Sequence, residues 1–173
     1  ELRSFTLGHV VPGLFTPTAT TQTGAGSLQW AAEALGDAPA DIAGLITAAA
    51  DVVAADEGLF FLPYLIGERS PWWDAHASGV FAGLRMHHRR PHLTRAVLEG
   101  VGYSLALCMA PLRRPGDGPV DVIGGGAASD TWLALLADIW GVPVRRRSVT
   151  TQANSLGAAV TGMVGLGLAG FEL

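Results

Sequence analysis

Residues 122–130 carry the residue types and spacing best suited to chemistry, because an apolar run there leads through three consecutive glycines into a helix start. Glycine lets backbone amides approach a ligand closely and adopts positive φ, and amides at a helix N-terminus favour anions. Such a segment can cradle a nucleotide phosphate with backbone groups alone. A tight strand-to-helix turn with no ligand is the alternative that this segment leaves open.

The same glycines also form an incomplete dinucleotide-binding pattern, Gly124-x-Gly126-x-x-Ser129. The next predicted strand ends in three arginines at 145–147, which would suit the 2′-phosphate of NADP. However, serine stands where the pattern has its third glycine, and only one crossover unit follows in the sequence. Arginines at a solvated strand end are the alternative interpretation of this run.

Histidine and cysteine give weaker signals. His88 and His92 lie four residues apart, but Pro91 interrupts the helix between them, and no second group has the spacing of metal ligands. Together with His87 they are expected to form a polar helix entry, so no metal site is predicted. Cys108 lies in an apolar helical stretch, which predicts a buried structural thiol rather than a nucleophile.

The composition narrows the function classes further. The chain has 173 residues, of which 49% are hydrophobic, and a formal net charge of −4. These values fit one domain with a sizeable core and argue against nucleic-acid binding, which needs clustered positive charge. All 11 basic residues are arginine, so a Walker-type lysine and a Schiff-base lysine are excluded.

The sequence carries no evident targeting or membrane segment. Its most apolar stretch, residues 156–171, is too short and too rich in glycine for a transmembrane helix. A single cysteine and the lack of a signal pattern favour a cytoplasmic protein. The chain begins with Glu1 and its first methionine is Met86, which predicts a fragment or a processed chain.

Hydrophobic periodicity and turn residues predict an α/β order of elements. Residues 4–23 are expected to form two short strands joined by a turn, and further strands are expected at 59–62, 80–84, 120–123 and 142–145. Helices are expected at 27–35, 39–56, 92–112, 129–140 and 154–167. From residue 119 onward strand, glycine turn, helix, strand and helix follow one another, which is typical of crossover units.

A long irregular segment, residues 63–79, is expected between two of the strands, and loops of this length are often functional. In it, Glu68 and Arg69 would form either a salt bridge that holds the loop or a pair that faces a cleft. Trp72 and Trp73 would pack on the core, cover an interface or stack on a sugar.

Four separated motifs resemble the FGGY family of carbohydrate kinases. Residues 79–84 (GVFAGL), followed after seven residues by 92–99 (HLTRAVLE), are similar to the C-terminal signature of that family. Residues 61–71 (FLPYLIGERSP) resemble the loop before that signature in xylulose and gluconate kinases. Residues 124–127 (GGGA) resemble the family's adenosine-binding motif, and 152–159 (QANSLGAA) resemble the opening of its last helix.

The resemblance implies an α/β fold of the actin/hexokinase/Hsp70-like (ribonuclease H-like) type, with a mixed sheet flanked by helices. It implies a single domain over residues 1–173, which would be the C-terminal, nucleotide-binding domain of an ATP-dependent kinase. The full enzyme would use ATP and Mg²⁺ to phosphorylate a hydroxyl of a sugar or sugar acid, with xylulose and gluconate as leading candidates. The ATP-binding residues that the resemblance implies are Gly124, Gly125, Gly126, Ala127, Ser129 and Asp130.

In that family the sugar binds mainly to an N-terminal domain, and the catalytic aspartate precedes the segment present here. The resemblance therefore implies that this N-terminal partner domain is missing, that the chain holds no catalytic residue, and that alone it is inactive. An NADP-binding oxidoreductase domain and a non-catalytic relative that serves assembly or regulation are the alternatives. Trp72, Trp73 or the domain-facing surface would be available for a homodimer, and no nucleic-acid or membrane partner is expected.

Overall fold

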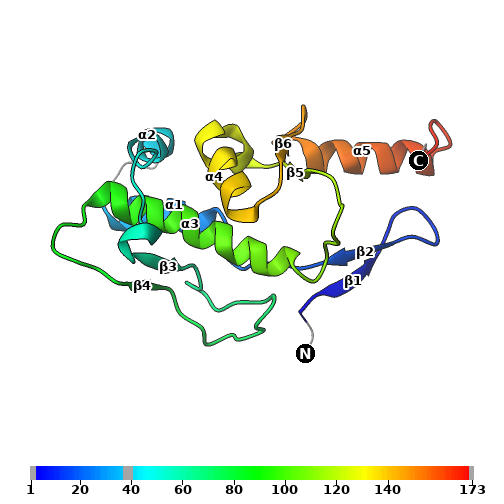
Figure 1. Cartoon of the computed structure of the whole chain (residues 1–173). Helices are drawn as coiled ribbons and strands as arrows, with labels where there is room; N and C mark the ends of the chain where they lie inside the picture. The colour runs from blue at the N-terminus through cyan, green and yellow to red at the C-terminus, as the bar shows by residue number, and fades with distance from the viewer. Residues whose placement is uncertain (1–2, 37–40, 172–173) are drawn as a thin grey trace.

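The computed structural model describes residues 3–36 and 41–171, which are arranged around one long helix, α3 (Arg90–Met109) (Figure 1). Helices α1 (Gly26–Ala34) and α4 (Asp130–Trp140) and strand β3 (Phe60–Leu62) pack against α3. The buried apolar side chains that meet between these elements form one core: Leu28, Ala31, Ile46, Ala49, Ala54, Leu59, Phe61, Ala96, Val97, Leu98, Val101, Trp132, Leu135 and Leu136.

Helix α3 begins at the helix entry that the sequence predicts. Arg89 precedes the helix in an extended conformation with φ −129°, and its amide donates to Nδ1 of His92 at 3.1 Å. Pro91 lies in the first turn, where its missing N–H would have no helical partner in any case. The expected span of 92–112 is thus confirmed with a two-residue shift at the start and an earlier end at Met109.

The strands lie in three small sheets. Strands β1 (Phe5–Gly8) and β2 (Phe15–Thr18) pair antiparallel, as do β3 and β4 (Val80–Ala82). Strands β5 (Val120–Val122) and β6 (Val144–Arg146) pair in parallel, on either side of α4 in the chain. Both kinds of pairing expected of a mixed sheet are present, but in the described residues they lie in three separate sheets of two strands each.

The predicted helix over 39–56 is wrong in length. Pro39 lies outside the described residues, and the structure has a short helix α2 (Ile42–Ala48) followed by a turn and a single 3₁₀ turn at Ala55–Glu57. The reason lies in α3, where Arg95 and Glu99 form an ion pair of 2.7 Å. Arg95 donates to the carbonyl of Ala50 at 2.9 Å, and Glu99 accepts the amide of Ala55 at 3.0 Å.

This buried ion pair satisfies backbone groups that a longer helix would have paired internally, so the chain can turn back into β3. Val53, which the helical pattern had placed on the buried stripe, is 47% exposed in consequence. The interaction joins positions more than forty residues apart, which a local pattern does not reveal.

Helix α5 (Ala153–Gly165) and the β1–β2 hairpin lie to one side of the group formed by α1, α3 and α4 (Figure 1). Helix α5 has no buried residue, and its apolar side chains Leu156, Val160 and Met163 are 37–49% exposed. Among the described residues, no helix combines the length and apolar character needed to cross a bilayer.

Candidate functional site

The glycine turn after β5 has the backbone geometry that its sequence predicts. Gly124 adopts φ 87° and ψ −175°, a conformation that side chains strongly disfavour, and its amide donates to the carbonyl of Thr150 at 3.1 Å. A 3₁₀ turn then spans Gly125–Ala128 and leads directly into α4. The strand, the turn and the helix start therefore follow one another without an intervening loop.

The fold constrains the small residues of this turn to different degrees. A Cβ at Gly126 would lie 2.9 Å from the ring of Trp132, so a side chain there would displace the indole. Ala127 is fully buried. A Cβ at Gly125, by contrast, would meet no atom within 4 Å, so only something outside the folded chain would limit side-chain size at that position.

A cavity of about 570 Å³ opens beside the turn, between it and helices α1 and α2. The side formed by α1 and α2 carries the large apolar side chains Leu28, Ile42 and Ile46, together with Gln29 and Thr47. The wall on the side of the turn and α4 consists of Gly125, Gly126, Ala128, Ser129, Asp130, Thr131 and Trp132. An apolar face opposite closely spaced amides suits a ligand with a flat apolar ring and an anionic group.

Trp132 lines the cavity and carries a buried donor without a partner in the described part of the chain. Its side chain is 5% exposed, and its indole Nε1 has no hydrogen-bond partner among the described residues. A buried N–H without an acceptor is costly in a folded protein. The nitrogen itself has no exposed surface, so a ligand in the cavity would reach it only if the indole ring moved.

The two polar residues predicted for the site take different roles. Ser129 is the N-cap of α4, where its Oγ accepts the amide of Trp132 at 3.2 Å. Asp130 is the first residue of the helix, and its side chain is 90% exposed and paired with Arg146. The sequence offered either residue as the cap, and the structure selects Ser129.

The three arginines of 145–147 are neither free nor arranged around a phosphate. Arg145 donates to both carboxylate oxygens of Asp121, at 2.5 and 3.0 Å, and Arg147 lies 3.6 Å from the same carboxylate. The hydrogen bond from Arg145 holds the pKa of Asp121 below its usual value and raises that of Arg145. A 2′-phosphate would have to displace these carboxylates, which argues against the NADP alternative.

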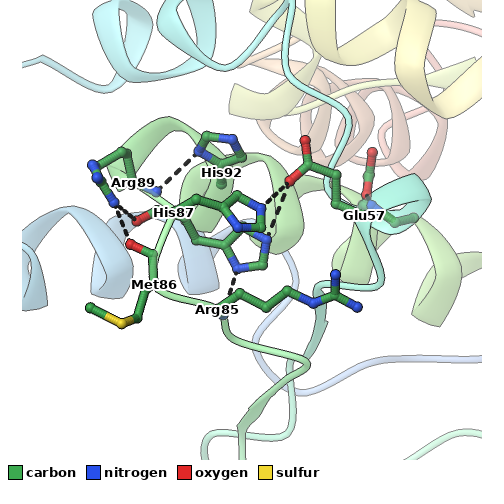
Figure 2. Close-up of polar contacts among 9 residues, drawn as sticks. Glu57, Arg85, Met86, His87, Arg89 and His92 are labelled. Carbon is green, nitrogen blue, oxygen red and sulfur yellow. Dashed lines mark hydrogen bonds and ion pairs between the residues drawn. The ribbon is translucent and has the colours of Figure 1, made fainter.

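The histidines form a cluster that the sequence analysis only partly foresaw (Figure 2). Nε2 of His87 and Nε2 of His88 lie 2.9 and 3.3 Å from one carboxylate oxygen of Glu57. These three ligand-type atoms lie within 4.8 Å of one another, close enough to raise the question of a metal ion. No sequence pattern indicates Glu57, which lies 30 residues before His87 and on a different element.

The protonation of the ring nitrogens favours a structural role for this cluster over a metal site. Nδ1 of His88 accepts the amide of Arg85 at 3.0 Å, so the proton of the neutral ring is on Nε2, which lies 3.3 Å from the Glu57 carboxylate but makes no hydrogen bond to the described residues. A metal ion would need the lone pair of that same nitrogen. Burial lowers the pKa of His88, and the hydrogen bond with His87 lowers that of Glu57.

Cys108 and Glu68 are structural in this fold. The thiol is 4% exposed, lies 3.3 Å from the carbonyl of Ser70, and has its pKa raised to about 11 by burial, so it is not a nucleophile. Glu68 is 3% exposed and accepts the hydroxyl of Thr21 at 2.7 Å and the amide of Arg69 at 2.8 Å. It therefore ties the 63–79 loop to the segment after β2.

The tryptophans of this loop remain half-exposed. The indole of Trp72 donates to the hydroxyl of Tyr64 at 3.1 Å, and Trp73 packs edge-on against Phe5 with ring centroids 5.9 Å apart. Their exposed fractions are 55% and 48%. They are packed against neighbouring side chains and are still accessible from outside.

Solved structures share this fold. Xylulose kinase from Rhodospirillum rubrum matches the whole chain with a TM-score of 0.78 and 32% identity, and gluconate kinase from Lactobacillus acidophilus matches 96% of it with a TM-score of 0.77 and 31% identity. The chain covers 35% and 34% of those two proteins. The fold is thus that of one domain of the sugar kinases with the actin/hexokinase-like architecture.

Sequence comparison gives the family. Residues 5–166 match the FGGY family of carbohydrate kinases, C-terminal domain. Xylulose kinase from Escherichia coli is 40% identical over 87% of this chain, and gluconokinase from Bacillus licheniformis is 40% identical over 79% of it. The chain belongs to the FGGY family of carbohydrate kinases. It spans about a third of the length of these relatives, 31% and 26% respectively.

Proposed function

We propose that this chain is the nucleotide-binding half of an ATP-dependent carbohydrate kinase. The observation that carries the proposal is the cavity between α1, α2 and the glycine turn, which joins apolar side chains of the two helices to the turn and the first residues of α4. The adenine ring would lie against Leu28, Ile42 and Ile46, and the phosphates would lie beside the turn. Phosphoryl transfer depends on positioning and charge stabilisation, which are the two things that such a site supplies.

The predicted site residues have distinct parts in this proposal. Gly124 sets the backbone path, Gly125 and Gly126 present amides to the phosphates, and Ala127 anchors the turn in the core. Ser129 fixes the start of α4 and, with Asp130, borders the ribose side of the cavity. ATP supplies the transferred phosphoryl group, and Mg²⁺ would neutralise its charge in company with groups outside this cavity.

The acceptor would be a hydroxyl of a small carbohydrate. The relatives named above are xylulose kinases and gluconokinases, which makes xylulose and gluconate the first substrates to test. We propose that the sugar site and the catalytic aspartate belong to an additional domain, so that the 173 residues alone do not transfer phosphate. The proposal implies a cytoplasmic enzyme, and the exposed tryptophans Trp72 and Trp73 are available for a homodimer.

The experiment is a phosphorylation assay on the natural polypeptide that carries these 173 residues. It is incubated with Mg²⁺–ATP and a panel of ketoses, polyols and aldonates, and ADP release is measured. We expect sugar-dependent ADP release with at least one ketose or aldonate. No turnover with any member of the panel, together with no binding of Mg²⁺–ADP, would contradict the proposal.

The chain by itself provides a second test. The isolated 173 residues are expected to release no ADP in the presence of any sugar. Measurable sugar phosphorylation by this chain alone would show that the assignment of the catalytic group to another domain is wrong.

A further inference from the structure

Strand β6 ends with Arg145 and Arg146, and Arg147 follows it directly. The side chains of these three arginines alternate between two faces. Arg145 and Arg147 both reach Asp121 on the neighbouring strand. Arg146, between them, reaches the glycine turn instead. This alternation follows from the extended backbone, in which successive side chains point to opposite sides.

Arg146 makes two contacts with residues of the candidate nucleotide site. Its Nε donates to the carbonyl of Ala127 at 2.6 Å, and its Nη2 forms an ion pair with the carboxylate of Asp130. The parallel pairing of β5 and β6 sets Arg146 opposite Val122, the last residue of β5. Because both strands end at the same edge, a side chain from β6 can span the turn that follows β5.

We propose that Arg146 is a positioning residue for the nucleotide site, an inference that rests on the function proposed above. It holds the carbonyl of Ala127, which fixes the orientation of the peptide groups in the turn. It also places a cation beside Asp130, a carboxylate that borders the cavity. Without that cation, the carboxylate would repel the phosphates of an anionic nucleotide.

The guanidinium group suits this double contact. Its planar donors can serve a carbonyl and a carboxylate at the same time, which a lysine ammonium cannot do with the same geometry. The side chain of Arg146 is 39% exposed, so the contact is reached by solvent and its strength is modest. Arg146 does not line the cavity, and it therefore acts through Ala127 and Asp130.

The neighbouring arginine is a matched control. Arg145→Gln removes one positive charge one residue away, and its partner Asp121 lies outside the cavity lining. Arg146→Gln removes the same charge from the face of the glycine turn. The comparison separates a local effect on the nucleotide from a general effect of net charge.

The experiment measures the Kd for Mg²⁺–ADP and the KM values for ATP and sugar in the natural polypeptide that carries this chain. Arg146→Gln is expected to raise the Kd for Mg²⁺–ADP and the KM for ATP by about threefold to tenfold. The KM for sugar and the melting temperature are expected to stay close to those of the wild type. Arg145→Gln is expected to leave all of these quantities unchanged.

A double variant isolates the electrostatic part. Adding Asp130→Asn to Arg146→Gln removes the unpaired carboxylate, so most of the lost affinity for Mg²⁺–ADP is expected to return. If the affinity is not regained, the charge compensation of Asp130 is overturned and the lost affinity is assigned to the contact with Ala127. If Arg146→Gln and Arg145→Gln behave alike, the positioning role of Arg146 is overturned. A wild-type protein that does not bind Mg²⁺–ADP overturns the proposed function itself, which keeps the two failures distinguishable.

Discussion

Gly125 offers the sharpest test of the nucleotide site, because the folded chain leaves room for a side chain there. A Cβ at Gly125 would meet no atom within 4 Å, and its backbone does not have the positive φ found at Gly124. Gly125→Ala should therefore be tolerated, and loss of backbone freedom in the unfolded chain should stabilise the fold by about 0.4–1 kcal/mol. The added methyl group would nevertheless stand in the cavity that Gly125 lines.

The expected effect on binding is much larger than the effect on stability. If the methyl group pushes a phosphate away from the amides of the turn, one charge-assisted hydrogen bond is lost, which costs about 1.5–3 kcal/mol. That loss corresponds to a Kd for Mg²⁺–ADP about tenfold to 150-fold weaker. Isothermal titration and thermal unfolding, both on the polypeptide that carries this chain, measure the two quantities separately.

Gly118→Ala is the control for this substitution. A Cβ at Gly118 would also meet no atom within 4 Å, and Gly118 lies outside the cavity lining. Its affinity for Mg²⁺–ADP is expected to equal that of the wild type. If Gly125→Ala binds Mg²⁺–ADP as tightly as Gly118→Ala does, the phosphates do not lie against this turn and the reasoning is refuted.

Two further predictions concern the scaffold. Gly100→Ala should destabilise the fold by about 3 kcal/mol or more, because its Cβ would lie 2.2 Å from the carbonyl oxygen of Phe61. Urea unfolding would test this. The control is Gly162→Ala in α5, where an added Cβ would meet no atom within 4 Å. The pKa of His88 is lowered from 6.5 in the folded chain, so the unfolded chain takes up the proton first and stability should fall as the pH drops below about 6.5. Urea unfolding curves recorded about every half pH unit between pH 7.5 and pH 5 should show this decrease in the free energy of unfolding. An equal pH dependence in His88→Gln would contradict the prediction.

The glycine turn and α4 illustrate what the sequence could predict. Their signals are local: three glycines after an apolar strand, a serine that can cap, and an apolar helical pattern that ends at Gly141 with φ 63°. Each of these features is decided by backbone conformation within a few residues. The helix predicted from Ser129 or Asp130 to Trp140 was confirmed for this reason.

The parts that the sequence did not predict depend on contacts between distant segments. The end of α2 is set by Arg95 and Glu99 on α3, and the histidine cluster is completed by Glu57 from the turn before β3. The role of Arg146 depends on the pairing of β6 with β5, which sends alternate arginines to different carboxylates. Such partners become visible only when the chain is folded.

The most direct test of the central claim is a map of backbone amide shifts as Mg²⁺–ADP is added to the protein. The largest shifts are expected on Gly125, Gly126 and the first turn of α4, with smaller ones on α1 and α2 across the cavity. NADPH at the same concentration should leave the chemical shifts of these amides unchanged. Shifts centred elsewhere, such as at the start of α3, would contradict the claim that this turn holds the nucleotide.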